Sequence, residues 1–271
     1  MALIGGGNMA RALVGGLLSQ GQDARTIVVA EPAAAPRAAL ARDFGVATTA
    51  DNAGAVAGAG VVVLAVKPQI MAQVARELGP ALQAGQPLVI SVAAGIRAAD
   101  LQQWIGSGLP LVRAMPNRPA LVGRGATGLY AGPEVNQAQR ALATRVLAAT
   151  GLVVWVPQES DLDLVTALSG SGPAYFFRLA ESMAAAGAAL GLDPGVARLL
   201  AAQTLAGAGS LVAAEQDPDL ARMSAAVASK GGTTEAALQC FAAQGLDQLV
   251  AAAMQAAARR SHELAAQFGN G

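Results

Sequence analysis

The sequence ALIGGGNMA, residues 2–10, places three glycines between a short apolar run and the start of a helical pattern. It fits G-x-G-x-x-A in the order strand, turn, helix, where the first glycine allows a tight turn and the second lets the backbone approach a diphosphate. The stretch predicts a dinucleotide-binding turn, and the alternative is an ordinary glycine-rich turn. The candidate cofactor-binding residues here are Gly5, Gly6, Gly7, Asn8, Met9 and Ala10.

The same alternation of β-branched runs and helical segments continues through the first part of the chain. Strands are expected at residues 2–4, 27–30, 61–66, 88–91, 111–114, 127–130 and 152–156, and helices at 8–20, 36–43, 69–78, 98–104 and 134–149. Runs such as VVVLAV (61–66) are apolar on both faces, which is typical of a parallel sheet covered by helices on each side. The order predicts a doubly wound α/β domain over residues 1–157.

After Pro157 the pattern changes, because β-branched runs of strand length give way to repeated helix signals. Helix starts are expected at Gly172-Pro173, Asp193-Pro194, Asp217-Pro218, Thr233 or Thr234, and Asp247. Helices joined by short loops indicate an all-α helical domain over residues 158–271. Its alanine-rich helices offer few large side chains for a self-sufficient core, so we expect a homodimer.

Composition argues against several classes of protein. The chain has 271 residues with 18 Lys and Arg against 18 Asp and Glu, so no nucleic-acid partner is expected. The longest apolar stretch, residues 54–66, has 13 residues and is interrupted by glycine, short of the ~20 that a membrane span needs. Glycines, Asn8 and Arg11 stand where a signal peptide would need an unbroken apolar segment, so we expect a soluble cytoplasmic protein without a membrane partner.

The chain has one cysteine, Cys240, and one histidine, His262. A single cysteine excludes an intramolecular disulfide and a thiolate-rich metal site, and no metal is expected. A single histidine in an alanine-rich helix argues against a Ser-His-Asp triad. If the chain is an enzyme, a cofactor rather than a protein nucleophile is expected to supply the difficult chemical step.

Polar and small residues follow several of the predicted strands. Glu31 ends the second strand, where an acid accepts hydrogen bonds from ribose hydroxyls and favours NAD over NADP. Arg37 lies near enough in sequence to favour the opposite, so both NADPH and NADH stay open as cofactors. Two further loops fall at the edge where such sheets bind ligands: Ala65, Val66, Lys67 and Pro68, and Ala93, Ala94 and Gly95. Lys67 is equally well explained as a solvated lysine before a turn.

The stretch SKGGTTEAAL, residues 229–238, interrupts the helical sequence. Read locally it is a turn between helices with Thr233 or Thr234 as N-cap. The same free amides and hydroxyls at a helix start also suit a bound anion. A second polar turn, SGSGP at residues 169–173, precedes another helix and has more serine than an N-cap requires.

Six blocks of the chain together resemble one family. They are IGGGNMA (4–10), AVKPQ (65–69), SVAAG (91–95), RAMPNRPA (113–120), LSGSGPAY (168–175) and SKGGTTEAAL (229–238). The chain is similar from end to end to pyrroline-5-carboxylate reductase. The resemblance implies an N-terminal Rossmann domain, a C-terminal helical dimerisation domain that interlocks with a second copy, and possible assembly into larger rings. It also implies hydride transfer from NADPH or NADH to 1-pyrroline-5-carboxylate, giving L-proline in the last step of proline biosynthesis.

The resemblance carries roles to individual residues. It implies cofactor contacts for Asn52 as well as for the loops already named, and it makes the Thr234 hydroxyl the catalytic candidate near the ring nitrogen. The implied substrate-binding residues are Ser171, Glu215, Ser229, Gly231, Gly232, Thr233 and Thr234. Asp217 competes with Glu215 for its position. Two residues depart from the family pattern: Lys230 replaces a common proline, and Arg118 replaces the usual threonine.

Two other interpretations stay open at this point. Another imine or hydroxy-acid reductase of similar architecture would usually carry a lysine on the first helix of the bundle, and residues 173–191 contain none. A non-catalytic NAD(P)-sensing module would bind the cofactor without turning it over.

Overall fold

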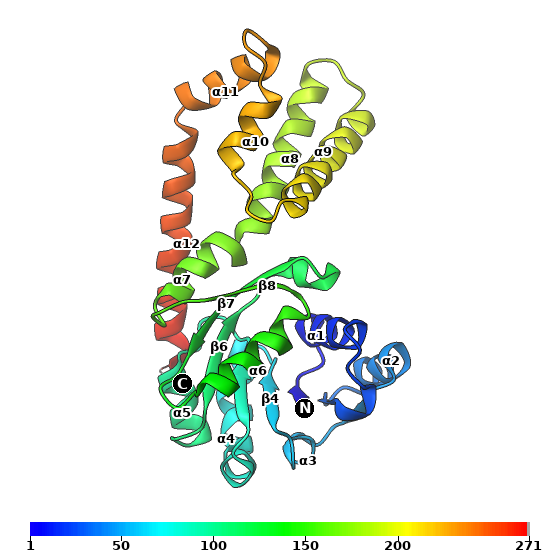
Figure 1. Cartoon of the computed structure of the whole chain (residues 1–271), viewed down its shortest axis with the longest axis vertical. Helices are drawn as coiled ribbons and strands as arrows, with labels where there is room; N and C mark the ends of the chain where they lie inside the picture. The colour runs from blue at the N-terminus through cyan, green and yellow to red at the C-terminus, as the bar shows by residue number, and fades with distance from the viewer. Residues whose placement is uncertain (270–271) are drawn as a thin grey trace. The chain divides into compact units, whose positions relative to one another are not determined.

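In a computed structural model, which describes residues 1–269, eight strands form one sheet in the order β3-β2-β1-β4-β5-β6-β7-β8 (Figure 1). Their bounds are β1 (Ala2–Ile4), β2 (Val28–Ala30), β3 (Ala47–Thr49), β4 (Val61–Leu64), β5 (Leu88–Ser91), β6 (Leu111–Met115), β7 (Gly125–Ala131) and β8 (Gly151–Trp155). All predicted strands of the α/β domain are present. β3 was not predicted, because it is short, partly exposed and lacks an apolar run.

Side chains on both faces of the central strands are buried. Leu3, Val63 and Ile90 belong to the apolar cluster on one face, and Ile4 and Leu64 belong to the cluster on the other. Helices α1 (Asn8–Ser19), α2 (Ala34–Phe44) and α6 (Gln137–Ala148) complete the first cluster, whereas α3 (Asn52–Val56), α4 (Pro68–Gly85) and α5 (Ala98–Ile105) complete the second. Burial on both sides explains why these strands read as continuous apolar runs. The fold is the predicted Rossmann-like, doubly wound sheet.

The helical elements of this part are α1 (Asn8–Ser19), η1 (Ala24–Thr26), α2 (Ala34–Phe44), α3 (Asn52–Val56), α4 (Pro68–Gly85), α5 (Ala98–Ile105), η2 (Arg118–Val122), α6 (Gln137–Ala148), α7 (Asp161–Val165) and the π-helical turn η3 (Thr166–Gly170). The predicted helices are present, and α4 extends past Pro80 to Gly85. One strand pair departs from the expected parallel arrangement, because β7 runs antiparallel to β6. Only residues 116–124 join these two strands, too few for a parallel crossover.

The chain divides into two compact units: residues 1–171 with 257–271, and residues 172–256. These limits differ from the predicted domain limits, 1–157 and 158–271, because the two ends of the helical segment group with the sheet. Ser261 on α12 (Leu246–Gly269) donates a hydrogen bond to Asp163 at 2.6 Å, and Phe268 packs against the second apolar cluster. The predicted domain boundary near residue 157 stays a prediction, because the compact units are not continuous stretches of the chain.

The second unit contains α8 (Gly172–Ala189), α9 (Pro194–Ala214), α10 (Leu220–Val227), α11 (Thr233–Ala243) and the first part of α12. Three helix starts differ slightly from the prediction, and one of them is that of α12, which begins at Leu246 rather than at Asp247. Asp219 rather than Asp217 caps α10 by accepting a hydrogen bond from the Arg222 amide, and Gly232 rather than a threonine is the N-cap of α11. Within residues 172–256 only Gly172, Ala197 and Ala201 are buried, so this unit has almost no core of its own.

Candidate active site

The glycine turn Gly5–Gly7 lies where the chain reverses its direction of travel across the sheet. β1 pairs in parallel with β2 on one side and with β4 on the other, so the loops after all three strands meet at one edge. The Gly5 amide donates a hydrogen bond to the Ala30 carbonyl at 2.8 Å, and the Ala65 amide donates one to the Ile4 carbonyl, also at 2.8 Å. Open α/β sheets bind their ligands at this kind of position.

Packing requires glycine at the first two positions of the turn. Gly5 has φ +99°, and a Cβ there would lie 2.9 Å from the Ala65 carbonyl oxygen. A Cβ on Gly6 would lie 2.7 Å from the Leu40 Cδ1 atom. The third position is different, because no heavy atom lies within 4 Å of the place that a Cβ on Gly7 would take. The turn therefore leaves open space directly before α1.

No carboxylate of the helix itself lies at the start of α1. Its N-cap, Gly7, has no side-chain cap, and the first turn, which begins at Asn8, contains no acidic residue. The first amides of a helix lack intrahelical acceptors and carry partial positive charge, so they bind phosphate groups well. The open space at Gly7 and the uncapped amides fit the diphosphate of a dinucleotide.

Glu31, predicted to accept ribose hydroxyls, uses its carboxylate within the chain. One oxygen accepts a hydrogen bond from the Gly6 amide at 2.9 Å, and the other accepts one from the Ala33 amide at 3.0 Å. The Arg37 guanidinium donates to the carbonyls of Glu31 and Pro32 at 2.8 and 2.9 Å. Glu31 therefore fixes the glycine turn, and Arg37 is held at the end of the same strand.

The remaining predicted cofactor residues lie on loops of the same unit. Ala65 and Val66 contact the position where a Gly5 Cβ would lie, while Lys67 is exposed as the N-cap of α4, which begins at Pro68. Asn52 is half-buried at the start of α3.

In the loop after β5, Ala93 is buried and Ala94 is exposed. Gly95 has φ +74°, and a Cβ on it would lie 3.2 Å from the Phe268 ring. The loops after β1, β2, β4 and β5 thus all lie at the carboxyl edge of the parallel strands, and those after β2 and β4 contact the glycine turn.

A cavity of about 300 Å³ lies at the start of α1. Its lining residues are Asn8, Met9, Pro116, Asn117, Arg118, Leu121 and Gly170. The side chain of the buried Asn117 connects η3 and β7. Its amide donates to the Ser169 carbonyl and its oxygen accepts from the Ala126 amide, both at 2.9 Å. The sequence analysis did not single out Asn117, because its two hydrogen-bond partners lie in segments that only the fold brings together. The half-buried Ser171 directly follows this region, and its amide donates to the Thr166 carbonyl at 2.8 Å.

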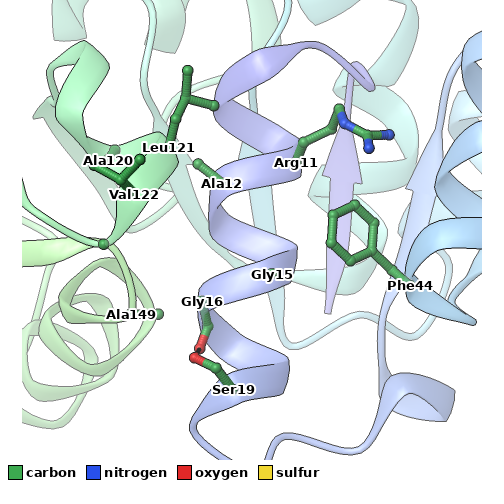
Figure 2. Close-up of a pocket in the computed structure, with 11 residues that line it drawn as sticks. Arg11, Ala12, Gly15, Gly16, Ser19, Phe44, Ala120, Leu121, Val122 and Ala149 are labelled. Carbon is green, nitrogen blue, oxygen red and sulfur yellow. Dashed lines mark hydrogen bonds between the residues drawn. The ribbon is translucent and has the colours of Figure 1, made fainter.

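A second hollow, a groove of about 480 Å³, lies along the side of α1 (Figure 2). Arg11 donates to Asp43 at 2.6 Å and holds the pKa of that carboxyl below its usual value. Its guanidinium also lies 5.0 Å from the centre of the Phe44 ring, so its charge is already satisfied. No predicted cofactor or substrate residue lines this groove, and we do not assign the active site to it.

The stretch 229–234 forms a tight turn before α11. Gly231 has φ +72°, the Gly232 amide donates to the Ser229 carbonyl at 2.9 Å, and a Cβ on Gly232 would lie 2.5 Å from the Ser229 Oγ atom. The Glu235 carboxylate accepts a hydrogen bond from the Gly231 amide at 2.6 Å. Among residues 1–269, no hydrogen-bond partner is found for the hydroxyls of Thr233 and Thr234. The predicted turn between two helices is therefore present.

Glu215 and its competitor Asp217 lie at the end of α9 and just beyond it. Glu215 is exposed at the C-cap of α9, and its carboxylate is 3.5 Å from the Arg222 guanidinium. Asp217 and Lys230 are also exposed.

Two family models match different parts of the chain, and relatives of one family match it over nearly its whole length. The family described as pyrroline-5-carboxylate reductase dimerisation matches residues 159–264, and that described as NADP oxidoreductase coenzyme F420-dependent matches residues 1–95. A pyrroline-5-carboxylate reductase of Pseudomonas aeruginosa is 47% identical over 99% of this chain and 98% of its own. The chain belongs to the pyrroline-5-carboxylate reductase family.

Solved structures of this family have the same fold. A pyrroline-5-carboxylate reductase from Coxiella burnetii matches with a TM-score of 0.92 and 40% identity, covering 97% of each chain. The Plasmodium falciparum pyrroline carboxylate reductase, solved with NADP bound, matches with a TM-score of 0.80 and 26% identity, also over 97% of each chain. The Rossmann-like unit and the helical dimerisation region predicted from the sequence are therefore both confirmed.

Proposed function

We propose that this chain reduces the C=N bond of 1-pyrroline-5-carboxylate to give L-proline, with NADPH or NADH as the hydride donor. The observation that carries the proposal is the end-to-end match to a pyrroline-5-carboxylate reductase at 47% identity. The glycine turn supports it, because its open space and uncapped helix start suit a dinucleotide. The reaction consumes one proton and converts the imine into a secondary amine.

The chain's contribution to this reaction is binding and orientation. The bound dinucleotide supplies the hydride. The amides at the start of α1 hold the diphosphate, Glu31 keeps the turn in shape, and the loops containing Asn52, Ala65–Pro68 and Ala93–Gly95 line the rest of the cofactor site. Holding two reactants in position can contribute about 7–11 kcal/mol to lowering the barrier, so no protein nucleophile is needed.

The turn before α11 is the proposed seat of the substrate carboxylate. The amides of Gly231 and Gly232 already have acceptors within the turn, so the free amides of Thr233 and Thr234 are the better donors to an anion. Gly231 and Gly232 shape the turn, and Ser171, Glu215 and Ser229 complete the proposed substrate-binding set. The Thr234 hydroxyl orients the imine nitrogen and donates a hydrogen bond to it, which makes Thr234 the proposed catalytic residue.

The proposed assembly is a cytoplasmic homodimer formed through the helical unit. Phe176, Phe177 and Leu249 are each about 60–70% exposed in the single chain, and a second copy would cover such side chains. By length and composition α9 alone, among residues 1–269, is also apolar enough to cross a membrane, with 6% of its apolar window buried. A helix covered by a second chain has the same composition, so α9 fits the dimer without a membrane. Light scattering on the purified protein should give twice the mass of one chain.

The test of the activity is oxidation of NAD(P)H measured at 340 nm with 1-pyrroline-5-carboxylate, run with each cofactor. We expect L-proline to form in equal amount to the NAD(P)H consumed. Cofactor binding without any oxidation would instead identify a sensing module. Turnover of other imines or keto acids, with none of this substrate, would identify a different reductase.

A further inference from the structure

The cavity at the start of α1 contains one charged side chain that the proposed function has not used. Of its seven lining residues, only Arg118 carries a charge. Arg118 is exposed at the first position of η2, and no ion pair or hydrogen bond of its guanidinium is found within residues 1–269. A positive charge on the wall of a cavity, without a partner in the chain, is free to bind an anion.

Three other arginines of this unit have partners within the chain. Arg11 pairs with Asp43, Arg37 donates to two carbonyls at the end of β2, and the buried Arg113 pairs with Glu159 at 2.7 Å. These three guanidiniums already have hydrogen-bond or ion-pair partners within the chain. Arg118 differs from them both in having no such partner and in lining a cavity.

Another part of the cavity lining, the start of α1, also carries positive potential. Asn8 and Met9 line the cavity from the first turn of α1, which has neither a side-chain cap nor an acidic residue. Helix starts of this kind carry partial positive charge. Because Arg118 and these residues line the same space of about 300 Å³, one anionic group in the cavity can be close to both.

We propose that Arg118 binds the diphosphate of the dinucleotide and adds a counter-charge to the helix start. This inference rests on the proposed function, which places that diphosphate at Gly7 and Asn8. A shorter, uncharged side chain at this position, such as threonine, could not supply this contact. Arg118 is therefore a further cofactor-binding residue, outside the glycine turn.

The test compares Arg118→Thr with the wild type in binding NADH, NADPH and ADP-ribose, the last measured by competition against NADH fluorescence. ADP-ribose contains the diphosphate but no nicotinamide. We expect all three dissociation constants to rise by about fivefold in low salt, the size of one exposed charged contact. The difference should shrink in 0.5 M NaCl, where the charges are screened.

Two variants provide controls. Arg124→Thr removes the same charge from an exposed position in the same loop that does not line the cavity, so its dissociation constants should stay unchanged. Arg118→Lys keeps the charge and should recover most of the lost affinity. If Arg118→Thr and Arg124→Thr raised the dissociation constants by the same factor, the effect would be general electrostatic attraction, and the proposal would be overturned.

Two further outcomes would also overturn it. Unchanged NADH and ADP-ribose binding together with a raised KM for 1-pyrroline-5-carboxylate would assign Arg118 to the substrate carboxylate. Unchanged binding of every ligand would leave Arg118 as an ordinary surface residue. In both cases the wild type still binds and oxidises NAD(P)H, so the proposed function stands. A wild type that does neither would remove the proposed function and this inference together.

Discussion

The two glycine turns, Gly5–Gly7 before α1 and Gly231–Gly232 before α11, are built alike but surrounded differently. In each, a glycine with positive φ precedes a helix, and a carboxylate accepts a hydrogen bond from a turn amide. At Gly5 and Gly6, neighbouring atoms lie within 3 Å of the position that a Cβ would take. At Gly231 nothing lies within 4 Å of that position, and at Gly232 the only close atoms belong to Ser229 of the same turn.

The first turn is therefore closely packed within a single chain, whereas the single chain leaves unfilled space beside Gly231 in the second. The first is held by β2, β4 and α2, so its shape is fixed before any ligand arrives. The second belongs to a unit with almost no core, and its free hydroxyls are accessible. We infer that the cofactor turn is preorganised by folding of a single chain, while the substrate turn depends more on dimer formation.

The largest effect is expected from Gly5→Ala compared with Gly231→Ala. At Gly5 an alanine is strained by φ +99° and meets the Ala65 carbonyl, so we expect a loss of about 3 kcal/mol in the free energy of unfolding. At Gly231 only the positive φ opposes alanine, and the loss should be about 1 kcal/mol. Urea denaturation at one protein concentration measures both, since dimer stability depends on concentration. Equal losses would contradict the contrast between the turns.

The sequence predicted the first turn better than the second. Its glycines, strand and helix are adjacent in the chain, so local pattern was sufficient. The bond from the Gly6 amide to Glu31 joins residues far apart in sequence and depends on β1 and β2 pairing, which no local pattern reveals. For the second turn, capping preferences favoured a threonine, yet the helix uses Gly232 because the Ser229 Oγ atom and carbonyl fill the space beside it. The cavity around Arg118 likewise needed the fold, since it joins α1, η2 and η3.

Thr234→Ala tests the open turn directly. Loss of the hydroxyl should lower kcat/KM for 1-pyrroline-5-carboxylate by about a hundredfold, because the imine nitrogen loses its oriented donor. The dissociation constant for NADH should not change, since the cofactor turn lies in the other unit. Thr234→Ser keeps the hydroxyl and should retain most of the activity. Unchanged kcat/KM in the alanine variant would remove the catalytic role of Thr234.

Glu31→Gln tests how far the cofactor turn depends on its own carboxylate. The neutral amide keeps one acceptor oxygen and loses one of the two bonds to Gly6 and Ala33, so we expect a loss of about 1 kcal/mol in stability. Removal of the negative charge should also raise the preference for NADPH over NADH by about fivefold. Steady-state kinetics with both cofactors measure this ratio. Glu77→Gln, which removes a charge from the exposed face of α4, should leave it unchanged.

The smallest effect is expected from Glu235→Gln, the matching change in the second turn. Glu235 accepts one bond, from the Gly231 amide, and the glutamine oxygen can still accept it, so stability should fall by less than about 0.5 kcal/mol. Its charge, however, lies beside the amides proposed for the substrate carboxylate, and like charges repel. We therefore expect the KM for 1-pyrroline-5-carboxylate to fall by about twofold at low salt, with no change in NADH binding.

The control for this change is Glu181→Gln, on α8, where the lost charge pairs with Arg178. That variant should keep the wild-type KM. A rise in KM for Glu235→Gln would mean that the carboxylate supports substrate binding by holding the turn, as Glu31 does in the first unit. The two glycine turns would then share one design, and their difference would lie only in the packing around them. A fall would show that the second turn binds its anion beside a negative charge of its own, as the first turn would bind a diphosphate beside Glu31, whose carboxylate accepts from the Gly6 and Ala33 amides.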